Sequence, residues 1–275
     1  MGFDPQTDKY PYPEYTDMHY LETVNYDKDT FGRDYPYIDR SRRFRIKRFF
    51  VDLLLDLIVF PAARVRLGLR IKGRDKLKKY RALLENGAIT CSNHIHFWDY
   101  ICVMRAVRPV RPYVLSWAPN LTGKDGNLVR AVGGIPIPES GVQATVSFLK
   151  TVTDLLDRKG WVHIYAEGSM WEYYRPIRPF KNGIGHIACA TETPVFPMAF
   201  SYREPGWIRK HIFGQIALLT LNIGDPILPD PDLCGKDRET DLVRRAHGAV
   251  CTLAGIKPDE NIYPPLFDHT ARIDC

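Results

Sequence analysis

A histidine-rich turn is the first part of the chain whose residue types could carry out chemistry. Asn93, His94, His96 and Asp99 follow a short apolar segment that is typical of a buried strand. Histidine titrates near neutral pH, so His94 is a candidate general base. Asp99 lies five residues further on, which puts the two on different faces of a helix. They can meet only if His94 lies in the turn and Asp99 folds back from the first turn of a following helix, where it would fix the imidazole tautomer.

Two other interpretations of this turn stay open. His94, His96 and Asp99 resemble the start of a metal-binding cluster, and the protein would then be a metal-dependent hydrolase. Such a site needs further ligands, and the later histidines lie in no recognisable ligand motif. The turn could also be a solvated loop of a lipid-binding membrane protein that has no catalytic activity.

Two further segments place polar and charged residues after a predicted strand at 161–166. Glu167, Gly168 and Ser169 follow that strand directly, and a carboxylate beside glycine at a strand end can reach into a site. The basic residues of the next loop are Arg175, Arg178 and Lys181. Their cations could bind a phosphate or a coenzyme A type of anion. Taken alone, each segment is also typical of an ordinary turn or a solvated loop.

The order of these motifs resembles that of the glycerophospholipid acyltransferases, of which the 1-acylglycerol-3-phosphate acyltransferases are the best known. The matching motifs are Asn93-His94 with Asp99, Gly133-Gly134-Ile135-Pro136-Ile137, Glu167-Gly168-Ser169, Phe180-Lys181-Asn182-Gly183 and Pro194-Val195-Phe196-Pro197. The resemblance runs from about residue 71 to about residue 228, which is more than half of the chain.

The resemblance implies a specific reaction. His94 would deprotonate the hydroxyl of a lysophospholipid similar to 1-acylglycerol-3-phosphate, and Asp99 would orient His94. The alkoxide would attack an acyl thioester, and coenzyme A or acyl carrier protein would leave as a thiol. Neither a metal, nor a cofactor, nor a covalent acyl-enzyme is expected. The residues expected to bind the substrates are Asn93, Glu167, Gly168, Ser169, Arg175, Arg178 and Lys181.

Two positions depart from the family's pattern. Members usually carry one arginine after the second motif and another in the third, and both contact the acceptor phosphate. In this chain Glu139 and Met170 stand at those positions. Either Arg175, Arg178 or Lys181 replaces them, or the acceptor is not a lysophosphatidate.

Alternating segments predict the frame that must position these motifs. Strands are expected at 87–92, 112–116, 133–138, 161–166, 194–202 and 216–223, and helices at 100–107, 140–160 and 238–253. Ser140 and Gln143 have the spacing of a capping box at the start of the second helix. Strands separated by helices predict an α/β fold with a mostly parallel sheet flanked by helices, and sites in such sheets form at the carboxyl ends of strands.

The net charge of +6 conceals an uneven distribution. Residues 1–40 hold nine acidic and four basic residues, and residues 41–80 hold thirteen basic and three acidic ones. These blocks therefore carry −5 and +10, and the rest of the chain carries +1. Such a modest total does not indicate a nucleic-acid partner, and we expect none.

Residues 41–70 are predicted to associate with a membrane surface. Basic residues flank an apolar run at 49–60 that contains Asp52 and Asp56. The run is shorter than the roughly 20 residues of a spanning helix, but it fits an amphipathic helix lying on an anionic bilayer. The alternative is a core helix of the globular domain with a solvated basic edge.

The chain is thus expected to have three parts: an acidic, tyrosine-rich arm at 1–40, the membrane-association segment at 41–70 and the acyltransferase domain at 71–275. The arm has no clear periodicity and no apolar leader, and the six cysteines form no CxxC pair. These features favour a reduced setting. We therefore expect a peripheral enzyme on the cytoplasmic face of a membrane.

Overall fold

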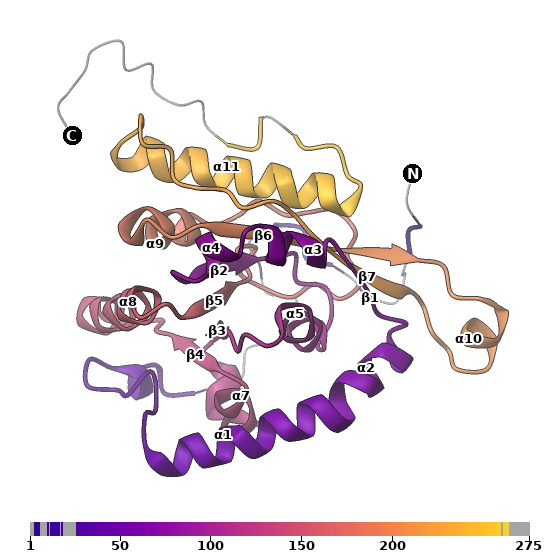
Figure 1. Ribbon diagram of the computed structural model, residues 1–275, viewed down its shortest axis with the longest axis horizontal. Helices are drawn as coiled ribbons and strands as arrows, with labels where there is room; N and C mark the ends of the chain where they lie inside the picture. Colours follow the sequence, from indigo (N-terminus) through magenta and orange to yellow (C-terminus); the bar gives the residue numbers. More distant parts are fainter. Residues whose placement is uncertain are drawn as a thin grey trace.

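A seven-stranded β-sheet forms the centre of the computed structural model (Figure 1), which describes residues 3–5, 10, 12–16, 18, 26–259 and 261–263. The strands are β1 (Arg70–Lys72), β2 (Ala88–Cys91), β3 (Tyr113–Trp117), β4 (Gly134–Ile137), β5 (Trp161–Ile164), β6 (Val195–Arg203) and β7 (Leu218–Ile223). Their order across the sheet is β1-β7-β6-β2-β5-β3-β4, and every neighbouring pair is parallel except β6 with β7. The prediction of an α/β fold with a mostly parallel sheet is confirmed.

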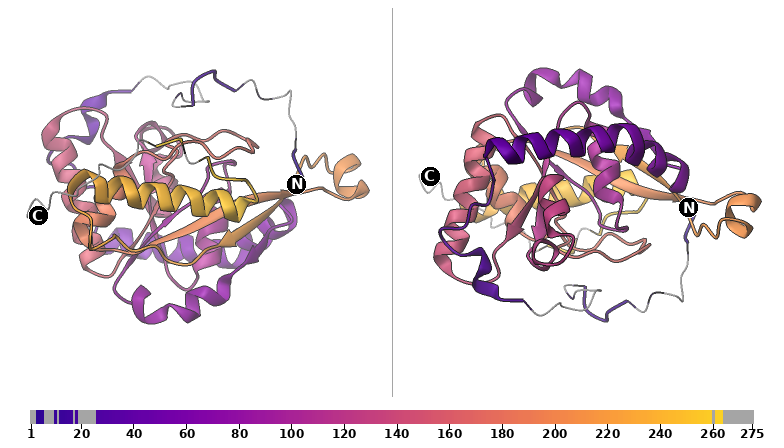
Figure 2. Two further views of the ribbon diagram at one scale, coloured as in Figure 1. Left: turned by 90° about the horizontal axis from the view of Figure 1, so that it is seen from above. Right: turned by 90° about the horizontal axis from the view of Figure 1, so that it is seen from below.

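Helices cover both faces of the sheet (Figure 1, Figure 2). They are α1 (Arg42–Leu54), α2 (Phe60–Arg66), α3 (Arg74–Lys79), α4 (Arg81–Leu84), α5 (Asp99–Val107), α6 (Pro119–Thr122), α7 (Gly126–Ala131), α8 (Val142–Asp157), α9 (Gly183–Thr191), α10 (Trp207–His211) and α11 (Gly235–Ala254), with a 3₁₀ turn η1 (Lys28–Phe31) and a π-helical turn η2 (Leu55–Val59). One core cluster joins α8, α9 and α11 to the sheet through residues such as Phe148 and Val243, and a second joins α5 and α2 through Val103 and Ala63. The result is a helix–sheet–helix sandwich.

Strands β2 and β5 carry the turns that bear the predicted site. All four residues of each strand are buried, as expected for central strands of a sheet covered on both faces. Cys91 pairs with Ile164 at the last position of their register. Strands β2 and β5 therefore end side by side, which brings the turn with His94 next to the turn with Glu167.

The start of α8 differs from the prediction. Ser140 does not cap this helix, because its hydroxyl donates to the carbonyl oxygen of Lys28 and to the side chain of Asp29 in the arm. Val142 and Val146 are 77% and 53% exposed, and the residues that the helix buries are Ala144, Phe148, Val152 and Leu156. The capping-box prediction is therefore wrong, because a distant segment takes the serine.

The described part of the arm packs against the domain. Phe31 and Tyr37 lie in the same core cluster as Phe148, and the Tyr37 hydroxyl donates to the carbonyl oxygens of Phe31 and Ala144. These aromatic side chains supply the burial that orders a segment without periodicity. Residues 1–2, 6–9, 11, 17 and 19–25 of the predicted arm, and residues 260 and 264–275 of the predicted domain, lie outside the described residues.

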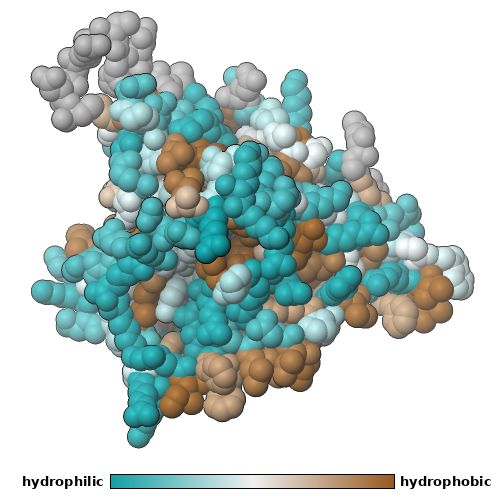
Figure 3. Space-filling view, in the orientation of Figure 1, coloured by the Kyte–Doolittle hydropathy of each residue, from teal (hydrophilic) through white to brown (hydrophobic). Residues whose placement is uncertain are grey.

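Helix α1, the turn η2 and helix α2 form one continuous helical segment that buries Leu55, Phe60 and Ala63 against the protein together with Asp52. Asp52 is 4% exposed and pairs with Arg108 at 3.2 Å and with Arg111 at 2.9 Å, while Asp56 pairs with Arg108 at 3.1 Å. The apolar residues that this segment exposes are Ile46, Phe49, Phe50, Leu53, Leu54, Leu57, Ile58 and Val65. Figure 3 shows this apolar surface along the lower edge of the molecule, over α1. The segment thus packs one side in the core and exposes an apolar face on the other.

Across the part of the chain that the structure describes, none of the helices combines the length and the apolar character needed to cross a bilayer.

Candidate active site

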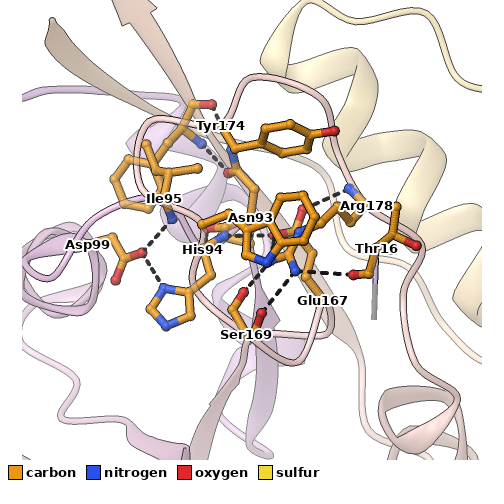
Figure 4. A network of polar contacts seen from close by, with 12 residues as sticks. Thr16, Asn93, His94, Ile95, Asp99, Glu167, Ser169, Tyr174 and Arg178 are labelled. Carbon is orange, nitrogen blue, oxygen red and sulfur yellow. Dashed lines mark hydrogen bonds and ion pairs between the residues drawn. The ribbon is translucent and has the colours of Figure 1, made fainter. Parts of the chain in front are cut away.

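His94 and Asp99 form the centre of the site (Figure 4). The Nδ1 atom of His94 lies 2.6 Å from Oδ2 of Asp99. A carboxylate at this distance holds the proton on Nδ1, so Nε2 is left with a lone pair. No hydrogen bond from the other described residues reaches Nε2, and the His94 side chain is 23% exposed. The imidazole is therefore arranged to take a proton from a molecule that enters from solvent.

The chain geometry that joins the two residues is local. Asp99 is the first residue of α5, and its Oδ2 atom also accepts the backbone N–H groups of Ile95 at 3.1 Å and His96 at 3.4 Å. These N–H groups belong to the turn itself, so the carboxylate closes the turn while it orients His94. The predicted fold-back of Asp99 onto His94 is thus present in the structure.

Tyr165 is a member of the site that the sequence motifs did not identify. Its hydroxyl donates to Oδ1 of Asp99 at 2.6 Å, and its ring stacks on the His94 imidazole with centroids 3.8 Å apart. The available signal was its position directly after β5 and two residues before Glu167, which puts it beside the end of β2. Tyr165 restrains both members of the pair.

The electrostatics of the site favour a charged carboxylate. Burial of Asp99 opposes ionisation, but His94 and the hydrogen bonds from His94, Tyr165 and Ile95 outweigh it, so the pKa of Asp99 lies below its ordinary value. Burial, followed by the charge of Asp99, raises the pKa of Tyr165 well above its ordinary value. The pair is therefore an imidazole held against a fixed negative charge.

Asn93 anchors the turn to the neighbouring strand. Its Oδ1 atom accepts the backbone N–H of Phe200 at 2.8 Å, and its Nδ2 atom donates to the Phe200 carbonyl at 3.1 Å. The side chain thus imitates a strand neighbour of β6 at the point where β2 has ended. Asn93 positions the backbone of His94 and does not face the open side of the site.

Glu167 is buried and fully engaged by the protein. Its Oε2 atom accepts the backbone N–H of His94 at 3.2 Å and Nη2 of Arg178 at 3.0 Å, and its Oε1 atom accepts the backbone N–H of Arg178 at 3.0 Å. Burial raises the pKa of Glu167, and Arg178 and these N–H donors limit the rise. In this arrangement Glu167 ties the turn that bears His94 to the loop after β5.

Arg178 lies inside this loop and not on its surface. Its side chain is 1% exposed, its guanidinium stacks on Trp171, and it donates to the hydroxyl and the carbonyl of Ser169. Described residues of the arm cover the same loop, because the carbonyl of Met18 accepts hydrogen bonds from the side chains of Ser169 and Trp171. Figure 4 shows this network around Glu167.

Lys181 and Arg175 are the predicted cations that stay closer to solvent. Lys181 is exposed, and its side chain lies against Gly168, where a Cβ atom would come within 2.6 Å of Lys181 Cε. Gly168 has φ +83°, a backbone conformation that favours glycine there. The Arg175 side chain is 26% exposed and lies 3.6 Å from Asp4. The structure therefore separates the three candidate cations into one buried and two accessible groups.

The two positions at which this chain departs from the family pattern are occupied by structural contacts. Glu139 accepts a hydrogen bond from Nε1 of Trp117 at 2.5 Å, and Met170 is 7% exposed. Neither side chain can take the place of a phosphate-binding arginine.

His96 is turned away from the metal-binding role of the alternative interpretation. Its Nδ1 atom accepts the backbone N–H of Trp98 at 3.0 Å. Within the described residues, no three side chains of the His, Cys, Asp or Glu types are grouped so that they could hold a metal ion.

Comparison with known proteins gives matches to acyltransferases. The profile of the family described as Acyltransferase matches residues 68–201. A 1-acyl-sn-glycerol-3-phosphate acyltransferase of Cocos nucifera is 24% identical over 194 residues, which cover 65% of this chain and 61% of that relative's length. The crystal structure of the 1-acyl-sn-glycerophosphate (LPA) acyltransferase PlsC from Thermotoga maritima superimposes with a TM-score of 0.53 at 15% identity, over 81% of this chain and 87% of that one.

The fold is thus an α/β fold with a mostly parallel sheet, and the polar site lies at the carboxyl edge of that sheet. The segment 68–201, just under half of the chain, is thus similar to the family described as Acyltransferase, and the solved structure shows that the fold is shared.

Proposed function

We propose that this protein transfers a fatty acyl group from acyl coenzyme A or acyl carrier protein to the hydroxyl of a lysophospholipid, as a step of phospholipid biosynthesis. The observation that supports this most is the 2.6 Å contact between His94 Nδ1 and Asp99 Oδ2 at a partly exposed edge. An acyl thioester is already activated, so the enzyme need only deprotonate the acceptor hydroxyl and stabilise the charge that develops.

The proposed reaction proceeds by direct transfer. His94 Nε2 takes the hydroxyl proton as the oxygen attacks the thioester carbonyl, and the resulting imidazolium is stabilised by the charged Asp99 carboxylate. The tetrahedral intermediate then collapses, the carbon–sulfur bond breaks, and the thiolate takes the proton from Nε2. Hydroxyl and thioester become ester and thiol, and His94 returns to its neutral form. Neither a metal nor a covalent acyl-enzyme takes part.

The predicted substrate-binding residues divide into two roles in this proposal. Asn93, Glu167 and Arg178 are positioning residues, because their polar atoms are committed to the His94 turn and the adjoining loop. Lys181 and Arg175 are the cations that remain for an anionic acceptor. Gly168 has no side chain, so the Lys181 side chain can lie close to the backbone there. An acceptor with a phosphate would therefore meet an exposed lysine.

The proposed enzyme works at the surface of a membrane. The outward apolar face of α1 and α2 lies beside basic residues, a combination that favours an anionic bilayer. The guanidinium of Arg66, the last residue of α2, lies over the ring of Trp98 at 5.1 Å, one residue before Asp99. The catalytic turn would thus lie near the bilayer that holds acceptor and product. We expect a peripheral protein on the cytoplasmic face.

The decisive experiment incubates the purified protein with acyl coenzyme A or acyl carrier protein and a panel of lysolipids in vesicles, and identifies the products by lipid mass spectrometry. His94→Ala is expected to lose several orders of magnitude of transfer while it stays folded. His186→Ala, at an exposed histidine paired with Glu239, is the matched control and should keep its activity. Near-normal transfer in His94→Ala would contradict the proposal, as would a stoichiometric metal that is lost in His96→Ala.

A further inference from the structure

The segment between β6 and β7 projects from the body of the protein and carries exposed apolar side chains. Both strands extend past the rest of the sheet, and residues 204–217, with α10, form the tip (Figure 1). Trp207, Ile208, Ile212 and Phe213 are 69%, 58%, 64% and 68% exposed. We call residues 204–217 the hairpin tip. Four neighbouring apolar side chains on a projecting tip indicate a surface that contacts a membrane or another molecule.

The hairpin tip is attached to the end of the helical segment α1–α2. Arg209 donates to the carbonyl of Val65 at 3.0 Å and to Oε1 of Gln215 at 3.1 Å, and Gln215 donates to the carbonyl of Arg66 at 2.5 Å. Val65 is itself 69% exposed. The apolar face of α1–α2 therefore continues onto the hairpin tip, and Figure 2, seen from below, shows the helices leading toward it.

A basic pocket lies where the two elements meet. Its volume is about 280 Å³, and it is lined by Arg64, Gly68, Leu69, Arg70, Arg203, Arg209 and Leu218. No acidic side chain is among these described lining residues. Four arginines from α2, β1, β6 and α10 thus converge without a carboxylate to balance them.

Arg203 forms the fixed wall of this pocket. Its guanidinium donates to Thr220 Oγ1 at 2.8 Å and to the carbonyl oxygens of Gly68 and Leu219. Burial, then the nearby charges of Arg70 and Arg209, lower the pKa of Arg203. A bound anion would relieve this crowding of like charges, and a phosphate suits the planar guanidinium donors.

We propose that the hairpin tip is a second membrane-inserting element and that the pocket of Arg64, Arg70, Arg203 and Arg209 binds the phosphate of an anionic phospholipid in the same bilayer. An apolar, aromatic tip that inserts beside arginines at the level of the headgroups is the combination expected of an interfacial element. Tryptophan, as at position 207, favours this interface because its ring is apolar and its N–H is polar.

The position of the pocket favours a bilayer over a soluble anion. It is continuous on one side with the apolar face of α1–α2 and on the other with the hairpin tip, so an anion bound there would sit between two apolar surfaces. Arg203 ends β6, which is parallel to β2 and places the pocket at the sheet edge that bears His94. Contact at two separate elements would fix the orientation of the site toward the membrane. Figure 3 shows apolar surface over α1 and at the hairpin tip.

The inference rests on the membrane association proposed above for α1–α2 but not on acyl transfer, so it is tested by binding without substrates. The full-length protein is floated with vesicles of phosphatidylcholine, alone or mixed with phosphatidylglycerol. One variant carries Ile212→Asp and Phe213→Asp, and its matched control carries Val142→Asp and Val146→Asp on the exposed face of α8. A second variant carries Arg64→Gln and Arg70→Gln, which are exposed, and its control carries Lys124→Gln and Arg158→Gln.

The hairpin variant is expected to bind mixed vesicles at least about tenfold more weakly than the wild type, since burial of two apolar side chains contributes a few kcal/mol. The arginine variant should lose the tighter binding that phosphatidylglycerol gives and bind mixed vesicles no better than phosphatidylcholine alone, and both controls should bind as the wild type does. Unchanged binding of both variants would overturn the inference while membrane association through α1–α2 stands. A wild type that binds no vesicles would overturn both. Loss of acyl coenzyme A binding in the arginine variant, with vesicle binding intact, would assign the pocket to the donor and also refute the inference.

Discussion

Replacing Asp99 by asparagine tests the charge that the structure places behind His94. The amide oxygen of the introduced side chain would still accept the N–H groups of Ile95 and His96, which lie 3.1 Å and 3.4 Å from Oδ2 of Asp99. The variant Asp99→Asn is therefore expected to keep the turn and the histidine tautomer. What it loses is the negative charge that stabilises the imidazolium during proton transfer.

The size of that loss follows from the geometry. With Nδ1 and Oδ2 2.6 Å apart, the centres of the two charges lie roughly 4 Å from each other, and at an effective dielectric constant of about 20 they attract by about 4 kcal/mol. Because the imidazolium forms only during the reaction, the loss of this attraction raises the activation free energy by the same amount. The turnover number should fall by about a thousandfold.

The assay measures turnover of acyl coenzyme A with a lysolipid at saturation, alongside thermal unfolding. Asp154→Asn, at a surface carboxylate on α8 that pairs with Lys150, is the matched control and should keep full activity. If folded Asp99→Asn retained turnover within about tenfold of the wild type, the carboxylate would not stabilise a charged histidine, and the reasoning from the 2.6 Å contact would fail.

The remaining predictions concern the buried groups around the pair. Tyr165→Phe keeps the ring over His94 but removes the hydrogen bond to Asp99, and should lower the free energy of unfolding by about 1.5–3 kcal/mol in urea titrations; an unchanged midpoint would contradict it. Burial lowers the pKa of His163 from 6.5 to about 3. The unfolded chain therefore binds a proton below pH 6.5 that the folded state does not, and stability falls as the pH drops through this window, by about 2 kcal/mol between pH 7 and pH 5. His163→Gln, whose amide can still reach Thr90, should lose less over the same range, and an equal loss would argue against a neutral histidine.

The contact between His94 and Asp99 was predictable because it is local. His94 and Asp99 are five residues apart, and the end of a buried strand followed by a helix leaves one compact way for them to meet. The preference for glycine at 168 is equally local, since it follows from a backbone with φ +83°. The parallel sheet was predictable from alternating strands and helices, because strands that are joined through helices pair in parallel.

Contacts between distant segments were not predictable in this way. Tyr165 reaches Asp99 across 66 residues, and Arg178 reaches Glu167 through a loop whose path no periodicity specifies. The sequence suggested that Arg178 could face an anion, whereas the fold buries it against a carboxylate. Ser140 likewise does not form the predicted cap, because its hydroxyl donates to the carbonyl oxygen of Lys28, 112 residues away.

The amino-acid sequence by itself determined the class of fold, the turn that joins His94 to Asp99 and the presence of a basic, apolar segment, because these depend on neighbours in the chain. Only the tertiary structure decided which way that segment faces. Arg108 and Arg111 draw Asp52 inward, and the apolar side chains on the opposite side of the helix are left outside. The meeting of this face with the hairpin tip and its arginines also depends on the sheet, since β1, β6 and β7 bring together residues that lie far apart in sequence.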